Sequence, residues 1–266
     1  MPTALTLSPH LDDAAFSCGG TMARLVAAGW RVVLVTAFTA SVPDPTGFAL
    51  ACQQDKGLGP EVDYMALRRE EDGRAAEALG IWPPVWLDLP EAPHRGYASV
   101  AELFGDTRSE DDAVVLPLTA AMRELAAELE PDLMLAPQAV GGHVDHVQLV
   151  RALEKASLSV PVLWWRDVPY GARGAQPAEP FRHRLQTFAE LPVVLDAASA
   201  SAKRAACLAY RSQIGFQFGG ANGLDAGLAA TGGIERFRAE GHLPVSFDDQ
   251  PRPAVGAAAL LAQNGR

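Results

Sequence analysis

The stretch ALTLSPHLDD, residues 4–13, joins a short apolar run to a cluster of polar side chains. Ala4–Leu7 has the composition of a buried β-strand, and His10, Asp12 and Asp13 follow shortly after it. Ligands of open α/β sheets bind at the carboxyl ends of the strands. The stretch therefore predicts a strand that presents one imidazole and two carboxylates to a binding site. The alternative interpretation is that the two aspartates form a turn and cap the next helix.

The residues after this stretch complete a β-α-β unit. Gly20–Ala28 has the pattern of a helix that ends at Gly29, where a glycine C-cap is expected. Arg31–Thr36 is a β-branched run typical of a parallel strand buried on both faces. Gly19 and Gly20 lack the GxGxxG spacing of a dinucleotide-binding loop, so a nicotinamide cofactor is not expected.

The periodicity of the remaining chain predicts more strands and helices in alternation. We expect strands at 85–89, 131–137, 161–165 and 192–196, and helices at 65–79, within 113–129, at 147–156 and at 197–213. Arg236 and Glu240 are assigned to a short helical piece. This order predicts an α/β fold with a mostly parallel sheet. We expect one domain over residues 1–248 and a loosely held tail over 249–266.

Composition excludes several classes of function. The chain has 266 residues, of which 48% are hydrophobic and 20% charged, so it can bury a core. Its net charge of -10 argues against nucleic acid as a partner, because such binders need a basic surface. No apolar run approaches the roughly 20 residues of a membrane helix, and no signal peptide is evident. Three widely spaced cysteines fit a reducing cytoplasm, where we expect the protein. A homo-oligomer is compatible with the sequence.

Two loops are expected to leave the same edge of the sheet as His10. Thr39–Tyr64 has several Pro, Gly and Asp residues and little periodicity, and it is interpreted either as a lid over the site or as a surface loop. Pro90–Tyr97 follows the predicted strand at 85–89. We predict that Glu91 and Arg95 of this loop contact the substrate.

A second polar cluster follows the predicted strand at 131–137. Gly141 and Gly142 allow a tight turn there, and His143 and His146 flank Asp145. Because both clusters follow core strands, they are expected at one sheet edge. His10 and Asp13, with one of the two later histidines, would then form an open zinc site.

In that site Asp12 would be the general base, and the remaining histidine would form an oriented acid or oxyanion-stabilising pair with Asp145. A lone histidine is more often an ordinary core or surface residue, but two histidines flanking an aspartate at the end of a strand favour a site.

These motifs carry a resemblance that runs through most of the chain. PHLDD at 9–13 and GHVDH at 142–146 together resemble the PIG-L/LmbE-like deacetylases, and weaker matches lie at 68–80 and 203–213. The resemblance implies a Rossmann-like three-layer sandwich that uses zinc to remove acetyl groups from N-acetylglucosamine-type amino sugars. Iron(II) or another divalent metal is the alternative to zinc.

The resemblance also implies a role for individual residues. His10, Asp13 and His146 would be the metal ligands, and Asp12 the base. His143, oriented by Asp145, would stabilise the oxyanion or protonate the leaving amine, and Arg68 would contact sugar hydroxyls.

The predicted function is therefore zinc-dependent hydrolysis of the N-acetyl amide of an amino sugar or its conjugate, a small-molecule substrate. Three alternatives remain. The first is a zinc-dependent amidohydrolase that acts on another N-acyl substrate, and the second is a non-catalytic sugar-binding protein. The third, a nucleotide-dependent transferase, is disfavoured because the sequence lacks GxGxxG and P-loop motifs.

Overall fold

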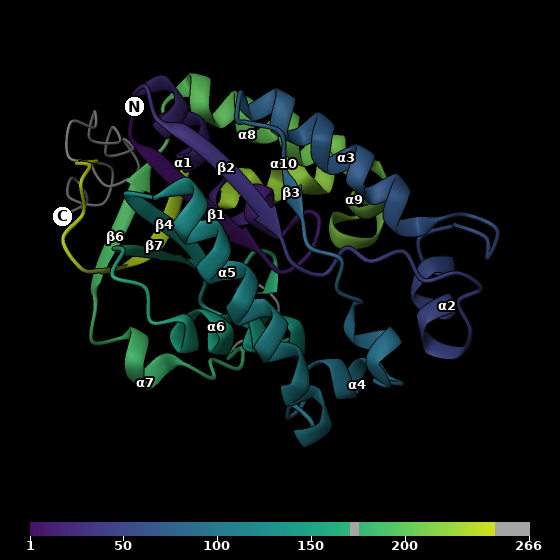
Figure 1. Ribbon diagram of the computed structural model, residues 1–266. Coiled ribbons are helices and arrows are strands. Elements are labelled where there is room, and N and C mark those ends of the chain that lie inside the picture. Colours follow the sequence, from purple (N-terminus) through teal and green to yellow (C-terminus); the bar gives the residue numbers. More distant parts are fainter. Residues whose placement is uncertain (171–175, 248–266) are drawn as a thin grey trace, which may run out of the picture.

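A computed structural model describes residues 1–170 and 176–247 (Figure 1). The strands are β1 (Thr3–Ser8), β2 (Arg31–Thr36), β3 (Val85–Trp86), β4 (Leu133–Pro137), β5 (Val162–Trp165), β6 (Ala189–Val194) and β7 (Ile234–Glu240). They form one seven-stranded sheet in the order β3-β2-β1-β4-β5-β7-β6. β1 to β5 run parallel, whereas β7 is antiparallel to both β5 and β6. The predicted α/β fold with a mostly parallel sheet is confirmed.

Helices cover both faces of this sheet (Figure 1). The helices are α1 (Asp13–Ala27), α2 (Gly47–Gln54), α3 (Tyr64–Leu79), α4 (Val100–Leu103), α5 (Val115–Leu129), α6 (Val144–Ala156), α7 (Arg182–Leu185), α8 (Ala197–Ala209), α9 (Arg211–Phe218) and α10 (Ala221–Ala230), with 3-10 turns η1 (Ala92–Arg95) and η2 (Ser109–Val114). None of the helices in the described ranges is both long enough and apolar enough to cross a membrane.

The side chains of the central strands alternate between two apolar cores. Val32 and Leu34 of β2 pack with residues of α1, α3 and α8, while Val33 and Val35 pack with residues of α5 and α6. A strand buried on both faces reads as a continuous apolar run, which is why the sequence predicts β2 correctly. The result is the three-layer arrangement that the resemblance implies.

The strand order reverses between β1 and β4. The chain proceeds from β1 to β2 and β3 on one side, and from β4 to β5 on the other. Such a switch point opens a crevice at the carboxyl ends of the two strands. The loops that follow β1 and β4 carry the two polar clusters, so the topology brings residues 10–13 and 143–146 together.

The predicted helical piece around Arg236 and Glu240 is wrong, because both residues belong to strand β7. In β7 the inward positions are occupied by Glu235 and Phe237. A buried glutamate interrupts the alternation of apolar and polar residues by which a strand is predicted from sequence. Lys203 of α8 neutralises it, with 2.6 Å between Nζ and Glu235 Oε1.

Helix α1 begins earlier than predicted, at Asp13 instead of Gly20. The helix is kinked at Cys18, and Glu235 accepts hydrogen bonds from the backbone N–H groups of Gly20 and Thr21 at 2.9 and 2.7 Å. The Leu195 side chain lies where a Cβ on Gly20 would be. The two adjacent glycines therefore lie inside the helix, where the Leu195 side chain packs closely against its backbone, and not at the start of the helix.

Other predicted boundaries differ at the ends of elements. β3 covers two residues and not the predicted five, and the helix predicted at 197–213 divides into α8 and α9 at Tyr210. Tyr210 leaves helical geometry, and its hydroxyl donates to Asp72 Oδ1 at 2.6 Å. The tail predicted at 249–266 lies outside the described residues.

Candidate metal centre and active site

The loop after β1 is shaped by Ser8. Its hydroxyl donates to the His10 carbonyl at 2.7 Å and accepts from the Ala14 N–H at 3.1 Å. Asp12 precedes α1 but makes no capping hydrogen bond with its side chain. Asp13 accepts from the His10 N–H at 2.9 Å. Asp12 thus occupies the N-cap position, but the alternative that its side chain caps the helix is wrong.

The loop after β4 turns on its two glycines. Gly141 and Gly142 have φ angles of 100° and 75°, which favour glycine. A Cβ on Gly141 would also lie 2.8 Å from the Tyr170 side chain. The turn places His143 at the N-cap of α6 and His146 within its first turn. Both imidazoles consequently point to the end of β1.

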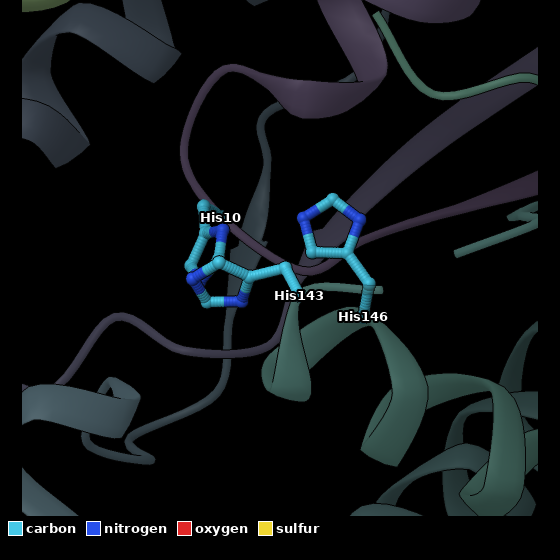
Figure 2. A group of neighbouring side chains, drawn as sticks. All are labelled: His10, His143 and His146. Atoms are coloured by element: carbon cyan, nitrogen blue, oxygen red, sulfur yellow. The ribbon is translucent and has the colours of Figure 1, made fainter. Parts of the chain in front are cut away.

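Three histidines converge at this point (Figure 2). His10, His143 and His146 each offer a ring nitrogen, and these atoms lie within 4.8 Å of one another. Asp13 lies between two of the rings, with its Oδ2 3.1 Å from His10 Nδ1 and 3.1 Å from His146 Nε2. All four side chains are buried. The group therefore matches the donor types of a divalent-metal site.

Carboxylates hold the outer nitrogen of two of these rings. Asp145 Oδ2 lies 2.9 Å from His10 Nε2, and Asp167 Oδ1 lies 2.7 Å from His146 Nδ1. Metal-binding histidines are typically oriented in this way, which leaves the other nitrogen for the ion. The other nitrogen of His146, Nε2, is buried and makes no hydrogen bond among the described atoms, and Asp13 Oδ2 lies 3.1 Å from it. The residues therefore fit a bound divalent metal.

Asp167 was missed by the sequence analysis. Asp167 comes two residues after the end of β5. Its place at the carboxyl end of a strand is the feature of the sequence that could have marked it as a site residue. Asp167 Oδ2 also accepts from the Val140 N–H at 2.9 Å. The same carboxylate thus fixes both the loop after β4 and the His146 ring.

The expected pairing of Asp145 with His143 requires a correction. The Asp145 carboxylate bonds His10, and only the Asp145 backbone N–H reaches His143, donating to Nδ1 at 3.2 Å. Because Nδ1 accepts this hydrogen bond, the proton of a neutral His143 ring lies on Nε2. Burial and the nearby His10 lower the pKa of His143 to about 3, so the ring is neutral.

The two aspartates after β1 differ in their protonation. Burial raises the pKa of Asp12 to about 7, although the neighbouring Arg68 opposes this shift. Against the effect of burial, His146 and His10 hold the pKa of Asp13 well below its usual range. Asp13 is therefore suited to bind a cation, and Asp12 to exchange a proton near neutral pH.

A cavity of about 210 Å³ opens beside these groups. Its polar lining includes His10, Asp12, His143 and Asp145 from the two motifs, with Asp55, Lys56, Tyr64, Arg68, Glu91 and Gln213 from other elements. Residues from the segment 39–64 lie in this wall, and the segment contains helix α2. It therefore forms one wall of the site in this structure.

The three predicted substrate contacts have different positions. Arg68 and Glu91 line the cavity and form an ion pair of 2.6 Å, and Arg68 Nη2 lies 3.3 Å from Asp12 Oδ1. Arg95 is not part of the described cavity wall. It binds Asp111 through two nitrogens and Asp145 Oδ1 at 2.7 Å. Arg95 thus lies behind Asp145 and holds its carboxylate.

Comparisons with known proteins show what this chain is similar to. The family model described as "GlcNAc-PI de-N-acetylase" (PIG-L) matches residues 5–157. A 2'-N-acetylparomamine deacetylase of Streptomyces fradiae is 35% identical over 178 residues, which cover 66% of this chain and 60% of that protein. The enzyme of the same name from Niallia circulans is 28% identical, with 80% of this chain and 81% of that protein covered.

A third relative is a 1D-myo-inositol 2-acetamido-2-deoxy-alpha-D-glucopyranoside deacetylase of Saccharopolyspora erythraea. It is 29% identical, and 60% of this chain and 55% of that protein are covered. The match thus spans less than two thirds of the Streptomyces and Saccharopolyspora proteins. Among solved structures, the zinc-inhibited teicoplanin deacetylase has a TM-score of 0.75 at 23% identity, covering 93% of this chain and 100% of its own. This last likeness concerns the fold.

Proposed function

Because the chain belongs to the GlcNAc-PI de-N-acetylase (PIG-L) family, we propose that it hydrolyses the N-acetyl amide of an amino-sugar conjugate. The products are acetate and a free amine. One observation carries the proposal: a buried His/Asp group with oriented imidazoles lies beside Asp12 in a cavity. The deacetylase names of the curated relatives support the same reaction class.

His10, Asp13 and His146 would hold the metal ion. His10 Nδ1 and His146 Nε2 are the nitrogens that face Asp13 Oδ2, while their other nitrogens bind carboxylates. When bound, zinc would supply a Lewis acid that polarises the acetyl carbonyl and lowers the pKa of a water molecule. Iron(II) is the alternative, because imidazole and carboxylate donors also suit it.

Asp12 takes the proton of the attacking water in this mechanism. The water oxygen bonds to the acetyl carbon, and the carbon–nitrogen bond then breaks. The proton held by Asp12 returns to the nitrogen, which leaves as an amine. A pKa of about 7 suits both transfers, and Arg68 fixes the carboxylate at 3.3 Å.

His143 stabilises the oxygen of the tetrahedral intermediate. Its Nδ1 accepts from the backbone, so Nε2–H is the donor that the neutral ring offers to the cavity. A fixed donor aimed at a developing oxyanion lowers the barrier, and removal of one such donor costs about 100-fold to 1,000-fold in rate. Asp145 acts as a positioning residue through His10.

Arg68 and Glu91 are the groups that we expect to meet the sugar hydroxyls. Both line the cavity, and their mutual ion pair holds each in a fixed orientation. Paired charges of this kind can bind hydroxyl groups without attracting a charged ligand. An N-acetylated amino sugar, the substrate type in the names of the relatives, fits this lining.

Acetate release from a panel of compounds tests the proposed function. The panel contains methyl N-acetylglucosaminide, 2'-N-acetylparomamine and the acetylated glucosaminyl-inositol, with N-acetyl-lysine as the matched non-sugar amide. We expect acetate from at least one sugar and none from N-acetyl-lysine. Release from N-acetyl-lysine alone would favour a different amidohydrolase, and a metal-loaded protein that binds the sugars without releasing acetate would indicate a non-catalytic role.

Arg95→Gln is expected to weaken metal binding by up to about 10-fold, the lower end of the loss that follows removal of a ligand's own partner, because Arg95 acts on His10 only through Asp145. The substitution removes the ion pair between Arg95 and Asp145, and Asp145 orients His10. Competition with a chromophoric chelator measures the metal Kd. Arg108→Gln is the control, because Arg108 forms an exposed pair with Glu102 and should leave the Kd unchanged. A raised KM with an unaltered metal Kd would instead make Arg95 a substrate contact.

A further inference from the structure

The mouth of the active-site cavity carries exposed apolar side chains. Val100, Phe104 and Phe216 are 62%, 37% and 51% exposed, and all three line the cavity. They are three of the eight large apolar side chains that are exposed in residues 1–170 and 176–247. Exposed apolar groups gathered at one cavity usually mark a binding surface.

The apolar side chains that line the cavity come from several elements. Val100 and Phe104 come from α4 and the residue after it, while Phe48 of α2 and Phe216 of α9 line the cavity from other elements. Lys56 ties α2 to α9, because its Nζ donates to the Cys52 carbonyl and lies 4.5 Å from the Phe216 ring centroid. We call Phe48, Val100, Phe104 and Phe216 the aromatic rim.

The aromatic rim adjoins the reaction centre. The Phe104 ring lies 5.2 Å from the His143 ring, edge-on, and 5.5 Å from the Tyr170 ring. A substrate whose amide is next to His143 therefore lies beside Phe104. The other side chains of the aromatic rim line the same cavity, so a group attached to the sugar can contact them.

The charges of the cavity do not select an ionic substituent. Asp55 and Lys56 are of opposite sign and adjacent in the chain, and both line the cavity. Deeper in, Arg68 is paired with Glu91 and Asp12. These residues are three carboxylates and two cations, so a phosphorylated substituent meets no excess of positive charge, and a polycationic substituent meets an excess of only one negative charge.

We propose that the aromatic rim binds a flat, apolar, uncharged ring attached to the amino sugar, with Phe104 and Phe216 as specificity-determining residues. This inference rests on the proposed function and narrows its substrate class. Aromatic rings that pack edge-to-face or offset add to the free energy of simple burial. The aromatic rim therefore favours aryl glycosides over small, sugar-linked or charged ones.

The test compares kcat/KM for four probes: methyl and 4-methylumbelliferyl N-acetylglucosaminides of the same anomer, N,N'-diacetylchitobiose, and 2'-N-acetylparomamine. We expect the aryl glycoside to exceed the methyl glycoside about 10-fold, from an aromatic contribution near 1.4 kcal/mol. Equal values, or the highest value for chitobiose or for the paromamine derivative, would overturn the proposal.

Two substitutions locate the effect. Phe104→Ala and Phe216→Ala should each reduce the aryl-to-methyl ratio several-fold. Leu116→Ala removes an apolar side chain on α5 that is 58% exposed and lies outside the cavity wall, and it should keep the ratio. An unchanged ratio in both phenylalanine variants would contradict the assignment.

Binding to the Asp12→Asn variant separates this inference from the proposed function. Calorimetry on the metal-loaded variant measures Kd for the aryl and methyl glycosides while turnover is slow. A lower Kd for the aryl glycoside supports the aromatic rim even if the wild-type protein releases no acetate, which would refute the proposed function alone. Equal Kd values, or a Kd ratio that Phe216→Ala leaves unaltered, would refute the aromatic rim.

Discussion

His146→Ala is expected to abolish metal binding and to lower turnover on the order of 1,000-fold or more, because a catalytic metal supplies several kcal/mol of transition-state stabilisation. His146 is fully buried, and its Nδ1 is held by Asp167 at 2.7 Å. The remaining Nε2 faces Asp13 Oδ2. Removal of the ring leaves two of the three proposed ligands.

Elemental analysis of purified His146→Ala, with acetate release under the same conditions, measures this effect. His183→Ala is the matched control, since His183 is an exposed histidine on α7, away from the cavity wall. It should retain wild-type metal content and activity. A His146→Ala protein that keeps its zinc and near-normal turnover would refute the ligand assignment.

Asp12→Asn is expected to retain the metal and to lose about 100-fold to 10,000-fold in kcat, the usual contribution of a general base. The amide is close in size to the carboxylate but cannot take a proton from water. Arg68 keeps its 2.6 Å pair with Glu91, so the guanidinium does not become an unpaired buried charge. The loss should therefore be mainly in kcat.

Metal content, thermal unfolding and steady-state kinetics of Asp12→Asn check this expectation together. Unchanged metal content and melting temperature with a large fall in kcat identify Asp12 as the base. Loss of the metal from this variant would place Asp12 among the ligands, and near-normal kcat would remove it from the mechanism.

The sequence predicts the centre of the fold and the two motifs of the site. β1, β2 and β4 are short apolar runs with helices between them, a pattern set by local composition. His10 and His143 follow such runs, so their meeting at one sheet edge depends only on parallel strands. Local sequence patterns, together with the rule that ligands bind at the carboxyl ends of parallel strands, are enough to predict the central strands and the two motifs.

The contacts that orient the site depend on long-range placement and were not predicted. Asp167 reaches His146 because β5 lies beside β4, with Trp165 in register with Pro137. Arg95 reaches Asp145 across a loop whose path the sequence does not specify. Polar residues in loops carry no signal for which of several neighbours they will bind.

Strand β7 was misread for a related reason. Its inward Glu235 looks like a surface residue until its partner is known. Lys203 and the N–H groups at the kink of α1 satisfy this carboxylate, and they lie 32, 215 and 214 residues away in the chain. A buried charge with distant partners conceals the periodicity that sequence analysis depends on.

The most direct test of the account is metal-dependent acetate release. Purified protein is analysed for metal, and acetate release from the N-acetylated amino sugars is measured before chelation, after chelation and after zinc is restored. We expect about one zinc ion per chain, activity that disappears with the chelator, and recovery with zinc. A protein that binds no divalent metal after reconstitution, or whose acetate release is indifferent to the chelator, would contradict this expectation.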